Sequence, residues 1–289
     1  MFGKLVKHEF RATRRIIPFV FLVTVILAVT MALSIILHLE ALIGISLGLL
    51  IMMMIAQIVV TFVLVIWRYY KTMCGNEAYL SFTLPIKPQL LLWSKLLVSF
   101  VWVALSFFVL LGVVVLIIVS YAKSTGTPLS EITEQIKFFW NVFGLAGNEA
   151  VAIPVIIAML IMSALYGLVQ MFFSVSLGST SKLHKYGIGG PVLIYVILYF
   201  VLQIVSVIFM GLIPLAVEFS QGATGSMTFR IVSRNMIEWL LGEITNSAVE
   251  TGVSQVGLVG LGAWIVVPLV ITGLLVATVR IIEKHTSVR

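Results

Sequence analysis

Six long stretches of this chain contain no charged residue, and they limit the folds that the sequence can adopt. Each exceeds the roughly 20 apolar residues that an α-helix needs to cross a bilayer. A Lys or Arg at the centre of such a helix would cost about 2.5–3.5 kcal/mol on insertion, so stretches this long do not arise by chance. They also lack the alternation of apolar and polar residues that is typical of membrane-barrel strands. Helices are therefore the structure by which these stretches can cross the bilayer. The intervals are 16–37, 41–67, 96–122, 150–181, 186–217 and 251–279.

We therefore predict an all-α polytopic membrane protein that forms a single transmembrane domain over residues 1–289. Hydrophobic residues make up 61% of the chain and charged residues 10%, whereas soluble domains carry about 25% charged residues. The lone Cys74 excludes an intrachain disulfide and cannot by itself form a zinc site. We place the six helical spans at 16–37, 41–67, 96–121, 151–177, 187–213 and 254–281.

The distribution of positive charge predicts how the spans are oriented. Of the 18 Lys and Arg residues, 14 lie on the side that holds both termini and four lie on the other. Positively charged segments remain in the cytoplasm, so we predict that both termini are cytoplasmic. The clusters follow the ends of the apolar intervals, which explains the net charge of +7 without nucleic acid.

The segments outside the spans have helical patterns of their own. Residues 1–15 combine an apolar face with basic residues, which predicts a helix in the inner headgroup layer; a plain topogenic charge cluster is the alternative. On the outer side, residues 123–149 and 218–250 carry apolar residues at helical spacing, so we expect amphipathic helices there before the last span. In 218–250 the stripe consists of Phe229, Val232, Met236, Leu240 and Ile244.

The inner loop at 75–85, GNEAYLSFTLP, differs from the runs around it. Asn76 can cap a short helix, and Pro85 prevents the helix from continuing. Tyr79, Leu80 and Phe82 would then form an exposed apolar patch, which indicates a partner protein. A loop helix that rests on the bilayer is the alternative.

Chemistry within the membrane has few candidates in this sequence. Proton relays and intramembrane proteases need ionisable groups at mid-depth, and the intervals contain none. No phosphate-binding loop motif is present, so any energy from ATP must come from another polypeptide. We expect no catalytic residue and no metal site. Gln57 and Gln203 are polar residues at depth that either join packed helices or face a transport path.

Four short motifs give the chain a resemblance to a known family: LVKHEF at 5–10, GNEAYLSFTLP at 75–85, SKLL at 94–97 and VSLGSTSKLHK at 175–185. With these motifs, the chain resembles the membrane subunit of type-2 ATP-binding-cassette (ABC) exporters, in particular the permeases common in Firmicutes. The resemblance extends to the layout of six spans over essentially the full chain. In the loop, Asn76 stands where the family more often has Asp, and Ala78 where it has Gly.

The resemblance implies roles for these segments. Residues 1–15 would be the interfacial elbow helix, and the loop at 178–185 a second, smaller contact with the ATPase. The second and fifth spans, with Gln57 and Gln203, would border the translocation path where two permeases meet. The loop at 75–85 would be the cytoplasmic coupling helix that docks on an ATPase subunit, through Gly75, Asn76, Glu77, Ala78, Tyr79, Leu80, Phe82, Thr83, Leu84 and Pro85.

From this we expect the permease subunit of an ATP-driven exporter in the bacterial cell membrane. It would pair with a second copy or a sister permease and with two ATPase subunits, which hold the ATP and Mg²⁺. The cargo would be amphipathic: a peptide, a drug or a lipid-linked molecule. Two other functions remain open: a membrane sensor or immunity protein that binds hydrophobic peptides without transport, and an ion-coupled secondary transporter.

Overall fold

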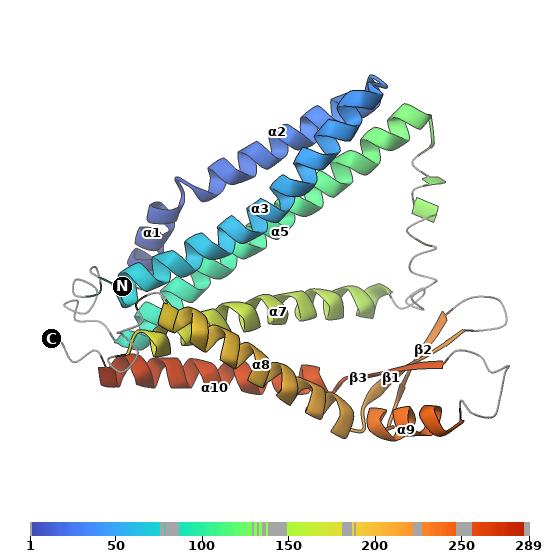
Figure 1. The fold of residues 1–289 in the computed structure, drawn as a ribbon. Coiled ribbons are helices and arrows are strands. Elements are labelled where there is room, and N and C mark those ends of the chain that lie inside the picture. The colour runs from blue at the N-terminus through green and yellow to red at the C-terminus, as the bar shows by residue number, and fades with distance from the viewer. Residues whose placement is uncertain are drawn as a thin grey trace. The chain divides into compact units, whose positions relative to one another are not determined.

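In the part of the chain that it describes, the computed structural model contains six helices that are long and apolar enough to cross a membrane, as many as the spans predicted (Figure 1). They are α2 (Ile17–Ile36), α3 (Glu40–Met73), α5 (Pro88–Thr125), α7 (Glu149–Gly178), α8 (Gly189–Leu212) and α10 (Gly262–His285). The structure describes residues 2–75, 78, 87–128, 130–131, 133–134, 137, 149–180, 187, 189–221, 227–246 and 256–285.

The chain divides into two compact units. The first comprises Met1–Ile132, Gly167–Ile194 and Leu275–Arg289, and the second comprises Thr133–Tyr166 and Tyr195–Leu274. Helices α7, α8 and α10 are each divided between the two units.

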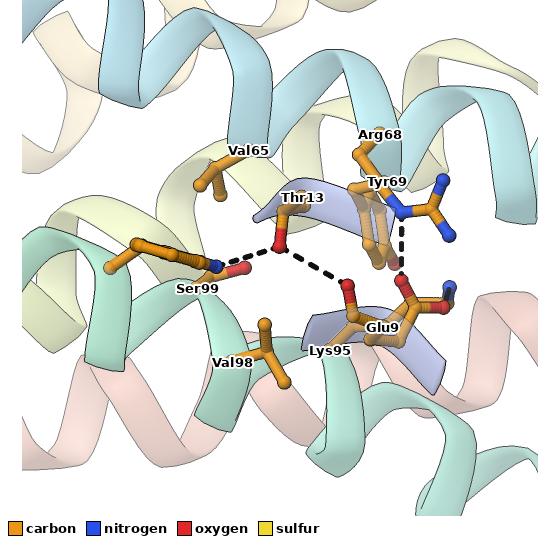
Figure 2. Close-up of a pocket in the computed structure, with 9 residues that line it drawn as sticks. Glu9, Thr13, Val65, Arg68, Tyr69, Lys95, Val98 and Ser99 are labelled. Carbon is orange, nitrogen blue, oxygen red and sulfur yellow. Dashed lines mark hydrogen bonds and ion pairs between the residues drawn. The ribbon is translucent and has the colours of Figure 1, made fainter. Parts of the chain in front are cut away.

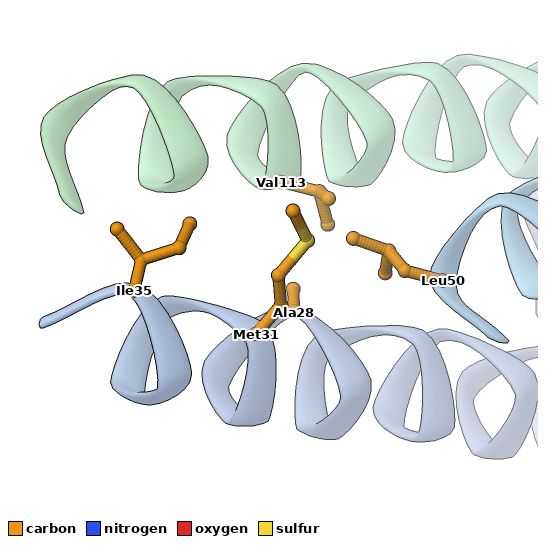
Figure 3. Packing of buried hydrophobic residues seen from close by; sticks show 5 residues of the cluster. All are labelled: Ala28, Met31, Ile35, Leu50 and Val113. Atoms are coloured by element: carbon orange, nitrogen blue, oxygen red, sulfur yellow. The ribbon is translucent and has the colours of Figure 1, made fainter. Parts of the chain in front are cut away.

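In the first unit, α2 packs along both α3 and α5 (Figure 1). Figure 3 shows the buried apolar cluster between these three helices, formed by Ala28, Met31, Ile35, Leu50 and Val113. Helix α1 (Phe2–Thr13) precedes α2 and packs against α5. Pro18 lies in the first turn of α2, where its missing N–H costs no hydrogen bond, so a new helix begins there.

A tight turn joins α2 to α3. The amide of Leu37 donates to the Leu33 carbonyl, and the amide of Leu39 donates to the Ser34 carbonyl. Between them, His38 adopts a left-handed conformation with φ of 53°. This geometry closes the C-terminus of α2 in the way that glycine usually does.

The second unit contains a small antiparallel sheet, so the prediction of an all-α fold is wrong for this part of the chain. Strand β1 (Ala216–Gln221) lies between β2 (Met227–Val232) and β3 (Val256–Gly260). Ala216 is opposite Val232 on one side and Gly260 on the other. Helix α9 (Met236–Asn246) follows β2. Phe229 and Val232 of the predicted helical stripe therefore lie in a strand, while Met236, Leu240 and Ile244 lie in α9.

The long helices expose large apolar side chains. Met52 is 71% exposed, Phe108 66% and Leu269 68%. Contiguous apolar surface of this kind is unfavourable in water, whereas lipid tails solvate it. The exposed surface and the six apolar helices together indicate a multi-pass membrane protein.

Candidate functional site

One carboxylate joins α1 to the two helices that flank the loop at 75–85. Glu9 Oε1 lies 2.5 Å from Lys95 Nζ on α5, and Glu9 Oε2 accepts a hydrogen bond of 3.0 Å from Arg68 Nε on α3 (Figure 2). Lys95 Nζ also donates to Thr72 Oγ1 on α3, at 2.7 Å. We call Glu9, Arg68, Thr72 and Lys95 the Glu9 cluster. It connects three helices at the end where α3 finishes and α5 begins.

The helical repeat places Glu9 in this position. Residues three, four and seven apart share one helix face, so Glu9 lies on the same side of α1 as Phe2, Leu5 and Thr13. Lys4, Lys7 and Arg11 are exposed elsewhere on the helix. An acid within the less exposed face needs a cationic partner, because an unpaired buried carboxylate is strongly unfavourable.

Burial and the neighbouring charges shift the pKa of Glu9 in opposite directions. Its side chain is 11% exposed and that of Lys95 is 4% exposed. Burial alone would raise the pKa of Glu9, but the neighbouring charges of Lys95 and Arg68, with their hydrogen bonds, outweigh it and hold the pKa below the ordinary glutamate value. Glu9 is therefore ionised at neutral pH.

A second contact holds the C-terminal end of α1. Trp102 Nε1 on α5 donates to Thr13 Oγ1 at 2.7 Å, and Thr13 Oγ1 lies 3.1 Å from the Glu9 carbonyl. Phe10 stacks on Trp102 with ring centroids 4.7 Å apart. A cavity of about 20 Å³, enough for one water molecule, lies among Glu9, Thr13, Val65, Arg68, Tyr69, Lys95, Val98, Ser99 and Trp102 (Figure 2).

Residues of three of the motifs meet around the C-terminal end of α3. Glu9 belongs to LVKHEF and Lys95 to SKLL, and these two form the ion pair. Ser176 belongs to VSLGSTSKLHK, and its hydroxyl is 2.7 Å from the hydroxyl of Tyr69 on α3. Tyr69 is buried and stacks on Phe172 of α7 at 4.0 Å between ring centroids.

The close approach of α7 and α8 requires a glycine in the third of these motifs. A Cβ on Gly178, the last residue of α7, would overlap the backbone nitrogen of Pro191 in the first turn of α8. Any larger residue would therefore push the two helices apart.

Only two residues of the predicted coupling segment are described. The amides of Cys74 and Gly75 both donate to the Tyr70 carbonyl, which closes α3, and the Ala78 amide donates to the Gly75 carbonyl in a further turn. Helix α5 then begins with Pro88. The other predicted residues lie outside the described part of the chain: Asn76, Glu77, Tyr79, Leu80, Phe82, Thr83, Leu84 and Pro85.

The two predicted path residues have different surroundings. Gln57 on α3 is fully buried, and its Nε2 donates to the Ser106 carbonyl at 3.0 Å and to Ser106 Oγ at 3.1 Å. It thus joins α3 to α5, as expected of a packing glutamine. Gln203 is exposed on α8. Beside Ser106, an apolar cavity of about 160 Å³ opens between α3 and α5, lined by Ile58, Thr61, Phe62, Val103, Ser106, Phe107 and Leu110.

Sequence reasoning missed the Glu9 cluster, although the signal was present. Glu9 interrupts an apolar helix face, and Lys95 interrupts the buried stripe of Leu91, Val98 and Trp102 on α5. An isolated acid and an isolated base on two such faces are complementary. The sequence alone does not show that the two faces meet.

The described residues contain no group of three or more His, Cys or Glu side chains placed to hold a metal ion. Burial raises the pKa of the Cys74 thiol, which lowers its reactivity as a nucleophile. Comparisons with protein-family models, with curated proteins and with solved structures found no match to this chain.

Proposed function

We propose that this chain is the membrane-spanning permease subunit of an ATP-driven exporter, with the loop at 75–85 as the segment that contacts the ATPase. The chain would act as a dimer with itself or a sister permease, in the bacterial cell membrane. It would move an amphipathic cargo outward, and the ATPase subunits would bind ATP and Mg²⁺.

One observation carries the proposal: motifs far apart in the sequence come together at the helix end that leads into this loop. The contacts Glu9–Arg68, Lys95–Thr72 and Tyr69–Ser176 connect LVKHEF, SKLL and VSLGSTSKLHK to the last two turns of α3. These are the motifs on which the resemblance to the exporter family rests. A shared mechanical role for these segments explains why they meet there.

The Glu9 cluster suggests how movement would pass from the ATPase to the spans. Nucleotide binding would displace the loop at 75–85. Because Glu9 ties α1 to both α3 and α5, these helices would move together rather than fraying separately at their ends. Interfaces of packed helices have discrete arrangements, so a displacement of this kind would switch the permease dimer between two states.

The two alternatives rest on weaker ground. An ion-coupled transporter would need an ionisable group at mid-depth. Among the described residues, Glu9 and Lys95 are the buried charged side chains, and both lie outside the uncharged intervals, in the Glu9 cluster. A non-transporting sensor would leave the convergence of motifs beside the loop unexplained.

Replacing both Tyr79 and Phe82 by Ala tests the proposal. We expect the variant to insert normally and to lose co-purification with the ATPase subunit and transport, because two large apolar contacts are removed from the docking segment. The measurement is the amount of ATPase retained on the purified permease, together with cargo efflux from cells. Unchanged retention and efflux would contradict the assignment of the loop.

A matched control removes the same aromatic area elsewhere. Phe19 and Phe108 are each 66% exposed on the apolar surface of the first unit. The double variant Phe19→Ala, Phe108→Ala should keep the ATPase bound. If both double variants lose it equally, the effect is one of general stability rather than of docking.

A further inference from the structure

We propose that the guanidinium group of Arg68 binds the phosphate of an anionic lipid headgroup at the membrane surface beside α1. This inference does not depend on the exporter function. Arg68 Nε donates to Glu9 Oε2 at 3.0 Å. Figure 2 shows the two terminal nitrogens pointing away from that carboxylate. Within the described part of the chain these nitrogens have no hydrogen-bond partner, and the side chain is 22% exposed.

The surroundings of Arg68 favour an anion at this position. Glu9 uses one oxygen for Arg68 and the other for Lys95, so only one carboxylate oxygen pairs with Arg68. Lys7 and Arg11 are exposed on α1, the helix that carries Glu9. Among the described residues no second acid pairs with Arg68. The terminal nitrogens of Arg68 are therefore available to an external anion.

The depth of Arg68 selects a lipid headgroup over a soluble anion. Arg68 is the first charged residue after the uncharged interval 41–67, so it marks the boundary between hydrocarbon and headgroups. Lys95 marks the same boundary on α5, directly before the interval 96–122. Their neighbours Trp67 and Trp93 are 55% and 49% exposed, and exposed tryptophans are typical of the headgroup level.

The geometry suits phosphate in particular. A guanidinium is planar and can donate two parallel hydrogen bonds to two oxygens of one phosphate, which an ammonium group cannot do. Glu9 acts here as a positioning residue. By holding Nε, it orients the terminal nitrogens and removes part of the entropy cost of ordering a long side chain.

The test measures the preference of the full-length protein for anionic lipid. The wild-type chain is placed in phosphatidylcholine bilayers, and the association of spin-labelled phosphatidylglycerol is compared with that of spin-labelled phosphatidylcholine. In Arg68→Lys, which keeps the charge and can still pair with Glu9, one of the two parallel hydrogen bonds to phosphate is lost. We expect the preference to fall by about fivefold, the factor that corresponds to roughly 1 kcal/mol for that hydrogen bond. An unchanged preference in Arg68→Lys would overturn the proposal.

The matched control is Arg14→Gln, which removes an exposed positive charge near α1 without touching the cluster. Diffuse electrostatic attraction predicts a loss in Arg14→Gln and none in Arg68→Lys, whereas a phosphate site at Arg68 predicts the opposite. Thermal unfolding in phosphatidylcholine bilayers shows that each variant is folded before its lipid preference is measured.

Two other occupants have distinct outcomes. If the site takes free phosphate, inorganic phosphate will stabilise the wild-type protein in phosphatidylcholine bilayers more than chloride does at equal ionic strength, and the headgroup assignment fails. If the site takes an acidic side chain of a partner protein, the isolated chain will show no preference for phosphatidylglycerol, and the proposal fails as well. The expected result is no gain from inorganic phosphate and a clear preference for phosphatidylglycerol.

Discussion

Replacing Glu9 by Gln should loosen α1 from α3 and α5. The variant removes the carboxylate that pairs with Lys95, whose side chain is 4% exposed, and loss of one partner of a buried ion pair costs about 3–5 kcal/mol. Because Gln keeps one acceptor oxygen, we expect about 3 kcal/mol or less, read as a lower unfolding temperature in detergent. Glu283→Gln, the same change at an exposed position, should have little effect. If Glu9→Gln and Glu283→Gln lower the unfolding temperature equally, the buried ion pair adds no stability.

The same carboxylate should make stability depend on pH. The pKa of Glu9 in the folded protein lies below its ordinary value. The contribution of the ion pairs is therefore complete above the ordinary glutamate range and is lost as the pH falls through the lowered pKa. In Glu9→Gln this part of the acid dependence should be absent. A wild-type and variant difference that stays constant as the pH falls from neutral to well below the ordinary glutamate range would contradict the ion-pair account.

At the scale of elements, the turn between α2 and α3 carries backbone strain. His38 has φ of 53°, a region that costs most L-residues roughly 1–2 kcal/mol. We expect His38→Gly to stabilise the protein by about 0.5–1 kcal/mol, since the added freedom of glycine in the unfolded chain offsets part of the gain. Leu37→Gly, at φ of −86°, should destabilise it instead. If His38→Gly and Leu37→Gly both destabilise the protein, backbone strain at His38 is not significant.

How far the sequence predicts an element depends on whether its partners are local. The bounds of α8 are close to those predicted from its uncharged interval, because membrane insertion depends on the hydrophobicity of the segment itself. Helices α3 and α5 run beyond their predicted ends, to Met73 and from Pro88, since contacts with α1 and each other stabilise these polar turns. Strand β2 was predicted as helix because its apolar spacing is ambiguous and its pairing with β1 is not visible in the segment alone.

The candidate site shows the same limit. The loop at 75–85 is recognisable from Asn76, Pro85 and its aromatic residues, all of which are local features. The Glu9 cluster joins residues separated by 59 and 86 positions. No periodicity within one helix predicts such a contact, and only the packing of α1 against α5 reveals it.

At the scale of the whole molecule, both proposals need the Glu9 cluster and the loop at 75–85 to lie on the cytoplasmic side. The loop must reach a cytoplasmic ATPase, and Arg68 must reach the inner leaflet, where anionic lipids concentrate. The distribution of Lys and Arg predicts this orientation, with 14 of 18 on the side of the termini. The prediction can be tested at residues that the structure shows to be exposed.

Single cysteines should report the orientation directly. In a Cys74→Ser background, cysteines at Arg234 and Glu238, both exposed, should react with a membrane-impermeant thiol reagent added to intact cells. A cysteine at Lys7, exposed on α1, should react only after lysis. Because all three sites are exposed, burial cannot cause a difference in their labelling. If instead Lys7 is labelled in intact cells and Arg234 and Glu238 only after lysis, the loop and the Glu9 cluster lie outside the cell. In that orientation no cytoplasmic ATPase could drive the protein through this loop.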